Sequence, residues 1–347
     1  MKAREAKHGT VKITAAPHVR TADSTTRIMW SVVLSLLPVV GASIWIFGPS
    51  ALLVLVASIA GCLLTERLFG ERGNSLADGS AMITGLLLGL CLPAGFPLWM
   101  AFLGGVFGIG FGKIVFGGLG QNIFNPALLG RAFLQAAFPV AITTWPVRSA
   151  DWWALRGDNF ALPFMSPGAS DAITGATPLG NVKFGDDPVI TPLFDLFLGN
   201  ISGSLGETSA LLILLGGIYL AIRGHLNWHI PVSILVSVFA FSGLFYLLGL
   251  SPFSPGFMLF SGGLMLGAWY MATDMVTSPV TNSGCWIFGV SIGLLVVIIR
   301  IWGGLPEGVM YAILLMNALV PFINRATQPR KFGSASDKSE PAAEKGS

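Results

Sequence analysis

One short segment of the sequence has the residue types that covalent modification requires. Residues 171–179 read Asp-Ala-Ile-Thr-Gly-Ala-Thr-Pro-Leu. Gly175 and Ala176 remove side-chain bulk beside Thr177, and Pro178 interrupts helix formation and favours extended backbone at Thr177. The pattern predicts a turn that presents one hydroxyl group to a modifying enzyme. A plain turn is the alternative, because Thr-Gly and Thr-Pro are common loop dipeptides.

Asp274 is a second candidate, because it ends an apolar run beside a Thr-Ser-Pro break. An ionisable group inside a bilayer is costly and is therefore a candidate for an ion pathway. The alternative is a helix-end carboxylate at the membrane surface that accepts hydrogen bonds from the local backbone.

Three further polar residues are candidates for cofactor binding. Arg131 lies within an apolar run, where it either pairs with the phosphate of a bound cofactor or extends its charged end to the membrane surface. Asn122 and Asn125 flank the start of a helix, which they could instead simply cap.

The sequence gives little support for a metal site. His225 and His229 are four residues apart without a third ligand, and interfacial packing is the favoured interpretation. Cys62, Cys91 and Cys285 lie in or beside apolar runs with no ligand spacing, as small buried residues do.

The elements that must position these residues are membrane helices. Charged residues make up 11% of the chain, against roughly 25% in an ordinary soluble domain, while apolar residues reach 53% and the mean hydropathy is +0.73. The net charge of +3 is too small to indicate a nucleic-acid partner. We expect an all-α, multi-pass protein in the lipid bilayer, with about ten spans of up to about 20 residues. The expected spans are Ile28–Phe47, Ala51–Leu68, Ala81–Leu92, Leu98–Gly112, Pro126–Ile142, Ala210–Ile222, Ile230–Leu250, Phe257–Met271, Ile287–Trp302 and Val309–Ile323.

The charge pattern predicts the orientation of these spans. The two tails are basic, the long loop at 143–208 is acidic, and cytoplasmic segments carry an excess of Lys and Arg. We therefore expect cytoplasmic termini in a bacterial inner membrane, an external loop, and Lys113 in a cytoplasmic turn. Arg300, near an expected outer end, does not fit this rule. The expected divisions are a tail at 1–27, five spans at 28–142, the loop at 143–208, five spans at 209–324, and a disordered tail at 325–347.

The two groups of five spans are predicted to be repeats. Gly-Gly-Leu at 117–119 precedes the fifth span, and Gly-Gly-Leu at 303–305 precedes the tenth. Pro93 and Pro279 are separated by the same number of residues as the two Gly-Gly-Leu segments, and each proline ends the short third run of its group. Because each group has an odd number of spans, the repeats would be inverted, with a site built from broken helix ends between them.

The segment at 171–177 resembles the motif of the transferase that joins FMN to threonine. Asp171, Thr174, Gly175, Ala176 and Thr177 occupy its fixed positions, with Thr174 where serine is commonest. Segments 17–30, 122–127 and 271–279 resemble one family, the D subunit of the Rnf ferredoxin:NAD electron-transport complex, which is related to the B subunit of the sodium-pumping NADH:quinone reductase. The resemblance covers residues 17–325, and Met275 stands where proline is expected.

This resemblance implies a redox role. FMN would hang from Thr177 by a phosphoester bond on the outer face, and riboflavin would be a second cofactor. The partners would be the other subunits of the complex, including a second FMN-carrying subunit and iron–sulfur subunits, and the flavin transferase. The complex would link ferredoxin and NAD to the translocation of sodium ions or protons.

Two other classes of function stay open. A solute channel or transporter would share the repeat and the broken helices but would hold no flavin. A membrane scaffold would hold redox subunits without carrying electrons. Since the sequence has no dinucleotide-binding fingerprint or P-loop of the usual spacing, we expect no direct binding of NAD or ATP, no catalytic residue, and no complete reaction by this chain alone.

Overall fold

The computed structural model describes residues 23–70, 75–146, 151–163, 177–185, 191–199, 201, 203–207 and 209–329, and all the elements within these ranges are helices. Five helices are long and apolar enough to cross a membrane, judged by length and composition. The expectation of an all-helical, multi-pass membrane protein is confirmed at this level. The five are α1 (Thr25–Phe47), α2 (Pro49–Phe69), α10 (His229–Leu247), α13 (Asn282–Trp302) and α14 (Val309–Thr327).

The remaining apolar runs form shorter helices. They are α3 (Ser80–Leu90), α4 (Leu98–Ile109) with its π-helical continuation η2 (Gly110–Ile114), and α9 (Ala210–Ile222). The fifth expected span is divided at Phe138 into α5 (Pro126–Ala137) and α6 (Pro139–Thr143), because Pro139 starts a new helix. The eighth is divided into α11 (Pro255–Phe260), α12 (Leu264–Leu266) and the π-helical η4 (Gly267–Met271), with Gly262 at a φ of 66° in the break.

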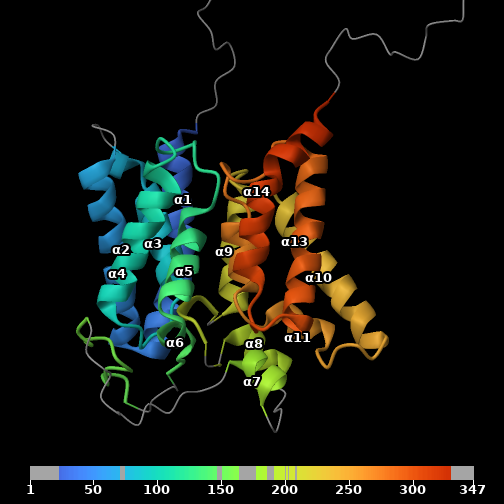
Figure 1. Cartoon of the computed structure of the whole chain (residues 1–347), viewed down its shortest axis with the longest axis horizontal. Coiled ribbons are helices and arrows are strands. Elements are labelled where there is room, and N and C mark those ends of the chain that lie inside the picture. The colour runs from blue at the N-terminus through green and yellow to red at the C-terminus, as the bar shows by residue number, and fades with distance from the viewer. Residues whose placement is uncertain are drawn as a thin grey trace, which may run out of the picture.

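The helices stand in two groups, with α1–α6 on one side and α9–α14 on the other (Figure 1). In the first group α2 packs along α3 and α4, and in the second α10 packs along α11 and α13. This common order of packing is what a repeat would require. The contact between α1 and α9 joins the two groups.

Small residues allow the closest helices to approach each other. Gly289 and Gly293 of α13 face Ser233 and Ser237 of α10. In the first group, Gly105 of α4 lies against the backbone of α2. Close packing of this kind holds helices together in a bilayer, where apolar surfaces gain little from leaving lipid.

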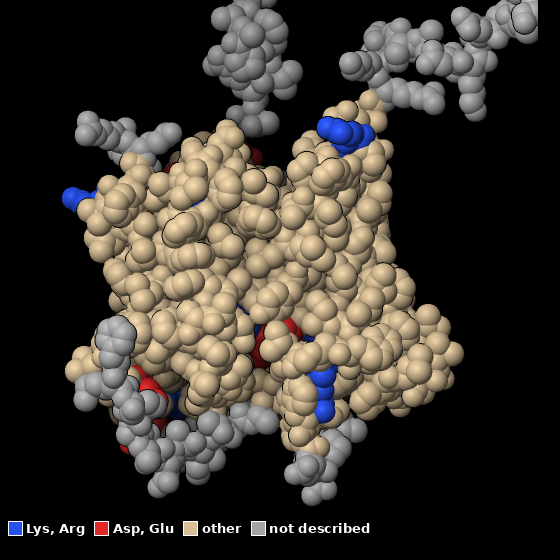
Figure 2. Space-filling model, in the orientation of Figure 1, with Lys and Arg blue, Asp and Glu red and all other residues tan. Residues whose placement is uncertain are grey.

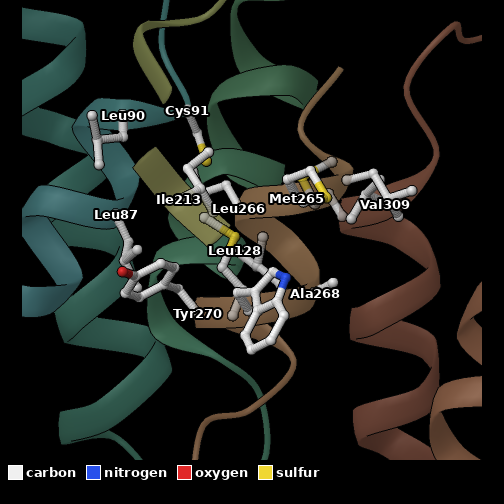
Figure 3. Close-up of a cluster of buried hydrophobic side chains, with 14 of the residues drawn as sticks. Leu87, Leu90, Cys91, Leu128, Ile213, Met265, Leu266, Ala268, Tyr270 and Val309 are labelled. Carbon is white, nitrogen blue, oxygen red and sulfur yellow. The ribbon is translucent and has the colours of Figure 1, made fainter. Parts of the chain in front are cut away.

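The centre of the molecule is apolar. Figure 3 shows its side chains, which come from both groups. Leu87 and Leu128 belong to the first group, and Leu266, Tyr270 and Val309 to the second; all five are buried. We call this set the central core.

The two ends of the bundle differ. The first residue of α1 and the last residue of α14 lie at one end, which we call the terminal end (Figure 1). The short helices α7 (Pro178–Phe184) and α8 (Leu193–Leu198) lie at the other, which we call the loop end. Most of the visible surface lacks charge, but Figure 2 shows acidic and basic atoms in a hollow between the two groups.

Candidate functional site

Thr177 is the last residue of the predicted attachment motif and the one that the structure describes, because 171–176 lie outside the described residues. It caps α7, and its Oγ1 accepts a hydrogen bond from the backbone N–H of Gly180 at 3.1 Å. The residue is only 4% exposed. The expectation of a freely presented hydroxyl is therefore wrong for this conformation: Thr177 is packed against the bundle, where it lines a cavity.

This loop-end cavity has a volume of about 410 Å³. Small-molecule sites commonly measure about 300–1,000 Å³ and combine apolar walls with a few polar groups. The aromatic walls here come from Trp145, Phe184 and Tyr311, and the polar groups are those of Arg131, Gln135, Thr143, Thr177 and Glu307.

Arg131 does not extend to the membrane surface. Its side chain is buried and pairs with the carboxylate of Glu307, in the loop between α13 and α14. The pair joins the first helix group to the second. Sequence reasoning missed Glu307, whose one visible signal was its position two residues after the second Gly-Gly-Leu.

Arg300 lies in the last turn of α13 and is fully buried within the bundle. Its guanidinium donates hydrogen bonds to the carbonyl oxygens of Met258 at 2.6 Å and Ser261 at 2.9 Å. These carbonyls lie at the end of α11, where the helix breaks and leaves acceptors without intrahelical partners. Arg300 therefore stabilises the broken helix.

Glu207 is a further buried acid that sequence reasoning did not single out. It ends the short helix η3 (Leu205–Glu207) and is 5% exposed. Neither carboxylate oxygen has a hydrogen-bond partner among the described residues. Its signal in the sequence was an acid placed three residues before the apolar run of α9.

Lys183 fixes α7 to the second helix group. Its Nζ lies within hydrogen-bond distance of four backbone carbonyls at the end of α13, those of Ile299, Arg300, Gly303 and Leu305. Partial burial lowers the pKa of the Lys183 amine. The four acceptors oppose that effect, because only the ammonium form has three protons to donate.

A second cavity lies toward the terminal end and has a volume of about 100 Å³. Asn122, Asn125 and Asp274 all line it, so the structure brings these three predicted residues together. Asn125 caps α5, since its Oδ1 accepts from the N–H groups of Ala127 and Leu128. Its Nδ2 donates to the Met271 carbonyl at 3.1 Å and so connects the two helix groups.

Asp274 fits both interpretations made from the sequence. One carboxylate oxygen accepts from the N–H of Val276 at 3.3 Å, and the other accepts from the hydroxyl of Thr277 at 3.2 Å. These are the local bonds of a structural carboxylate. The same group lines the terminal-end cavity, as an ion-pathway residue would.

Lys113 lines the same cavity; the sequence predicts it in a cytoplasmic turn, whereas it lies buried in the π-helical η2. Its Nζ lies 2.5 Å from Glu66 Oε1, 2.6 Å from the Ser80 hydroxyl and 3.9 Å from Asp78 Oδ2. The expected packing role of the histidines is consistent with their contacts: His229 stacks on Trp228, and Nε2 of His225 lies 3.8 Å from Asp23. Within the described ranges, no group of three or more His, Cys, Asp or Glu side chains could hold a metal ion.

The predicted site residues therefore fall into two groups. Thr177 and Arg131 line the loop-end cavity, whereas the two asparagines and Asp274 line the other. The central core separates the cavities: Leu87 and Tyr270 also line the terminal-end cavity, and Val309 lines the loop-end cavity.

Comparison with known proteins identifies the family. Residues 12–333 match the NQR2, RnfD, RnfE family. The D subunit of the proton-translocating ferredoxin:NAD(+) oxidoreductase complex of Clostridium ljungdahlii is 42% identical, over 93% of this chain and 96% of that protein. The D subunit of the ion-translocating oxidoreductase complex of Stutzerimonas stutzeri is 41% identical, over 90% and 93%.

A third relative comes from Acetobacterium woodii. The D subunit of its Na(+)-translocating ferredoxin:NAD(+) oxidoreductase complex is 38% identical, over 95% of this chain and 98% of that protein. The resemblance seen in the sequence is confirmed, and the chain belongs to the NQR2, RnfD, RnfE family.

Proposed function

We propose that this chain is the D subunit of an ion-translocating ferredoxin:NAD⁺ oxidoreductase and carries electrons through FMN attached to Thr177. The names of its relatives support the complex. The observation that carries the flavin assignment is that the last residue of the attachment motif lines the loop-end cavity. The other subunits, among them a second FMN-carrying subunit and iron–sulfur subunits, would supply and remove the electrons.

The residues of the loop-end cavity suit this cofactor. Bound FMN supplies one- and two-electron transfer. Thr177 would hold its phosphate through the side-chain oxygen, and Arg131 would add an opposite charge on the same cavity wall. Trp145, Phe184 and Tyr311 offer flat apolar faces that exclude water from a ring system.

Thr177 is buried when α7 is docked, so attachment by the flavin transferase requires this face to be open. We propose that the transferase acts before α7 packs on the end of α13. The docked position then keeps the attached group at the bundle rather than in the surrounding water.

The terminal-end cavity is our candidate for riboflavin. Trp269 lines it, and its indole N–H is buried without a partner among the described residues, so it could donate to a flavin carbonyl. Asn122 and Asn125 would add amide groups. At about 100 Å³ the cavity is smaller than a typical small-molecule site, so its walls would have to move to admit a ring system.

Two further parts of the proposal concern the membrane. The loop end would face outward from a bacterial inner membrane, with both termini in the cytoplasm, as the charge pattern predicts. The two helix groups would be inverted repeats, with Asp274 on the path of the translocated ion.

One experiment tests the flavin assignment. The chain would be produced with the flavin transferase, and its peptides analysed by mass spectrometry. We expect one FMN, less water, on Thr177 in the wild-type protein and none in Thr177→Ala. Thr143→Ala is the matched control, because Thr143 lines the same cavity outside the motif and should leave attachment unchanged.

The same preparations separate the alternatives. Flavin released from Thr177→Ala by acid should be riboflavin. Protein without any flavin under these conditions would instead support a solute channel or transporter. If Thr177→Ala lost its FMN but the assembled complex kept normal electron transfer, the chain would be a scaffold.

A further inference from the structure

The carboxyl group of Glu207 lies beside the loop-end cavity and has no role in the proposed attachment of FMN. It is held rigidly by the first helix group. The backbone N–H of Leu205 donates to the Leu92 carbonyl at 3.1 Å, and the Ser43 hydroxyl donates to the Leu205 carbonyl at 2.7 Å. The turn that carries Glu207 is thereby fixed to the ends of α3 and α1.

The helix break in the second group faces this carboxyl group. A Cβ built on Gly263 would lie 3.9 Å from Nη1 of Arg131 and 4.0 Å from Oε1 of Glu207. Glycine at this position leaves the space between the two charged groups open. On the neighbouring Gly262, a Cβ would lie 3.1 Å from Nη2 of Arg300 and 3.9 Å from Cγ of Glu307. The break therefore lies among four charged side chains.

The partners of these charges leave one carboxyl group unpaired. Arg131 pairs with Glu307, and the donors of Arg300 go to the Met258 and Ser261 carbonyls. Glu207 and Glu307 both border the break, and each has a buried carboxyl oxygen without a hydrogen-bond partner among the described residues. Two ionised carboxylates have acceptors only and cannot bond to each other, whereas one protonated carboxyl group can donate a hydrogen bond to the other.

The charges also indicate when the proton binds. Two arginines and two ionised glutamates sum to zero, so the cluster can be neutral without the proton. A negative charge arriving in the adjacent cavity disfavours two ionised carboxylates at a buried site. Glu207 is the group that responds, because Glu307 is held by Arg131. Its other neighbours are the Ser204 hydroxyl and the buried thiol of Cys91.

We propose that Glu207 is a proton-binding site coupled to the redox state of the flavin on Thr177. When one electron from a neighbouring redox subunit reaches that flavin, the Glu207 carboxylate takes one proton from water. When the electron leaves, the proton returns to water. A metal cation is a poorer ligand for this site, because two guanidinium groups already stand beside it. The inference rests on the proposed attachment of FMN.

The test is a redox titration of the Thr177 flavin in the assembled complex at several pH values. Flavins take up protons themselves on reduction, so the relevant quantity is the difference between wild type and Glu207→Gln. One extra proton per electron adds about 59 mV per pH unit. We expect this increment in the wild-type protein and in Asp195→Asn, a loop-end carboxylate outside the cluster, and its loss in Glu207→Gln.

A second measurement tests the proposal even if Glu207→Gln fails to assemble into the complex. Reduction of the wild-type complex should produce the infrared C=O band of a newly protonated carboxyl group. Glu207→Asp should keep such a band at a shifted position, because it keeps the carboxyl group. Thr177→Ala should show no such band on reduction, because it lacks the coupled flavin.

The outcomes are distinct. Flavin on Thr177 with the same pH dependence in Glu207→Gln as in wild type would overturn the proton site and leave the proposed function intact. Absence of flavin from Thr177 would overturn both. Loss of the wild-type band on adding sodium ions would show that a metal cation, not a proton, occupies Glu207.

Discussion

Asp274 is the residue at which a structural role and a functional role can be separated by experiment. Asp274→Asn keeps one side-chain oxygen that can accept from the Val276 N–H, and its NH2 group can donate to the Thr277 hydroxyl oxygen, but it removes the charge from the terminal-end cavity. If Asp274 is on the ion path, Asn should lower ion uptake about tenfold or more, since a buried charged ligand contributes several kcal/mol. FMN content should not change, because Thr177 lies at the other end.

Ion uptake into vesicles, measured together with electron transfer, checks this prediction. Asp274→Glu is the matched control and should retain more uptake than Asn, since the charge survives. Uptake at the wild-type level in the Asn variant would restrict Asp274 to its local hydrogen bonds.

Single residues were predictable from the sequence where their role depends on near neighbours. The capping role of Asn125 follows from its place before Pro126, and the motif that ends at Thr177 is contiguous. Arg131 and Glu307 are 176 positions apart, so no local pattern indicates that they pair. The roles of Glu207 and Arg300 were missed for the same reason.

At the scale of helices, Lys183 supplies the charged anchor of α7, beside the apolar packing of Leu179. Lys183→Met removes hydrogen bonds from a charged donor, each contributing about 1.5–3 kcal/mol where buried and less where water screens it. We expect FMN attachment to be unchanged or faster, because attachment requires α7 to be undocked. The attached flavin should be more accessible, with fluorescence quenching by iodide several-fold stronger than in wild type.

Lys183→Arg is the control for this measurement, since it keeps a positive donor near the same carbonyls. Equal quenching in the Met variant and wild type would show that other contacts keep α7 in place.

The contact between α10 and α13 gives a second prediction for the helices. A Cβ at Gly293 would overlap the Ser237 hydroxyl and lie 3.0 Å from the Ile234 carbonyl oxygen. Gly293→Leu should force these helices apart and destabilise the protein by at least the ~1–3 kcal/mol of an overpacked core. Size-exclusion chromatography after heating should show a lower melting temperature.

Gly41→Leu is the matched control, because Gly41 lies in α1, is exposed, and would meet no atom within 4 Å. A melting temperature for Gly293→Leu equal to that of Gly41→Leu would mean that α10 and α13 separate without cost.

The helices themselves were largely predictable, because apolar length and glycine or proline breaks are local properties. The sequence-based start and end of α2, and the end of α14, differ from the structure by a few residues, as helix ends commonly do. The break at Phe138 was not predicted, since an apolar run continues through it. Nor were the π-helical turns η2 and η4, which have no distinct composition.

For the whole molecule, the charge pattern predicts which end faces the cytoplasm. A reporter fused at the C-terminus should be active only as a cytoplasmic reporter, and one inserted near residue 185 only as an external reporter. The physical reason is the excess of basic residues in the tails and of acidic residues in the loop. Cytoplasmic activity at both positions would overturn the arrangement of five spans on each side of the loop.

The central core has a consequence for energy conversion. A pump of the proposed kind is useful only if ions cannot flow back down the gradient between reaction cycles. Leu87, Leu128 and Leu266 are buried apolar side chains of the core between two cavities that each contain charged groups. A bare ion in such surroundings costs several kcal/mol. If the translocated ion passes through this chain, the core would oppose its backflow, and each ion that crosses would require the core to open.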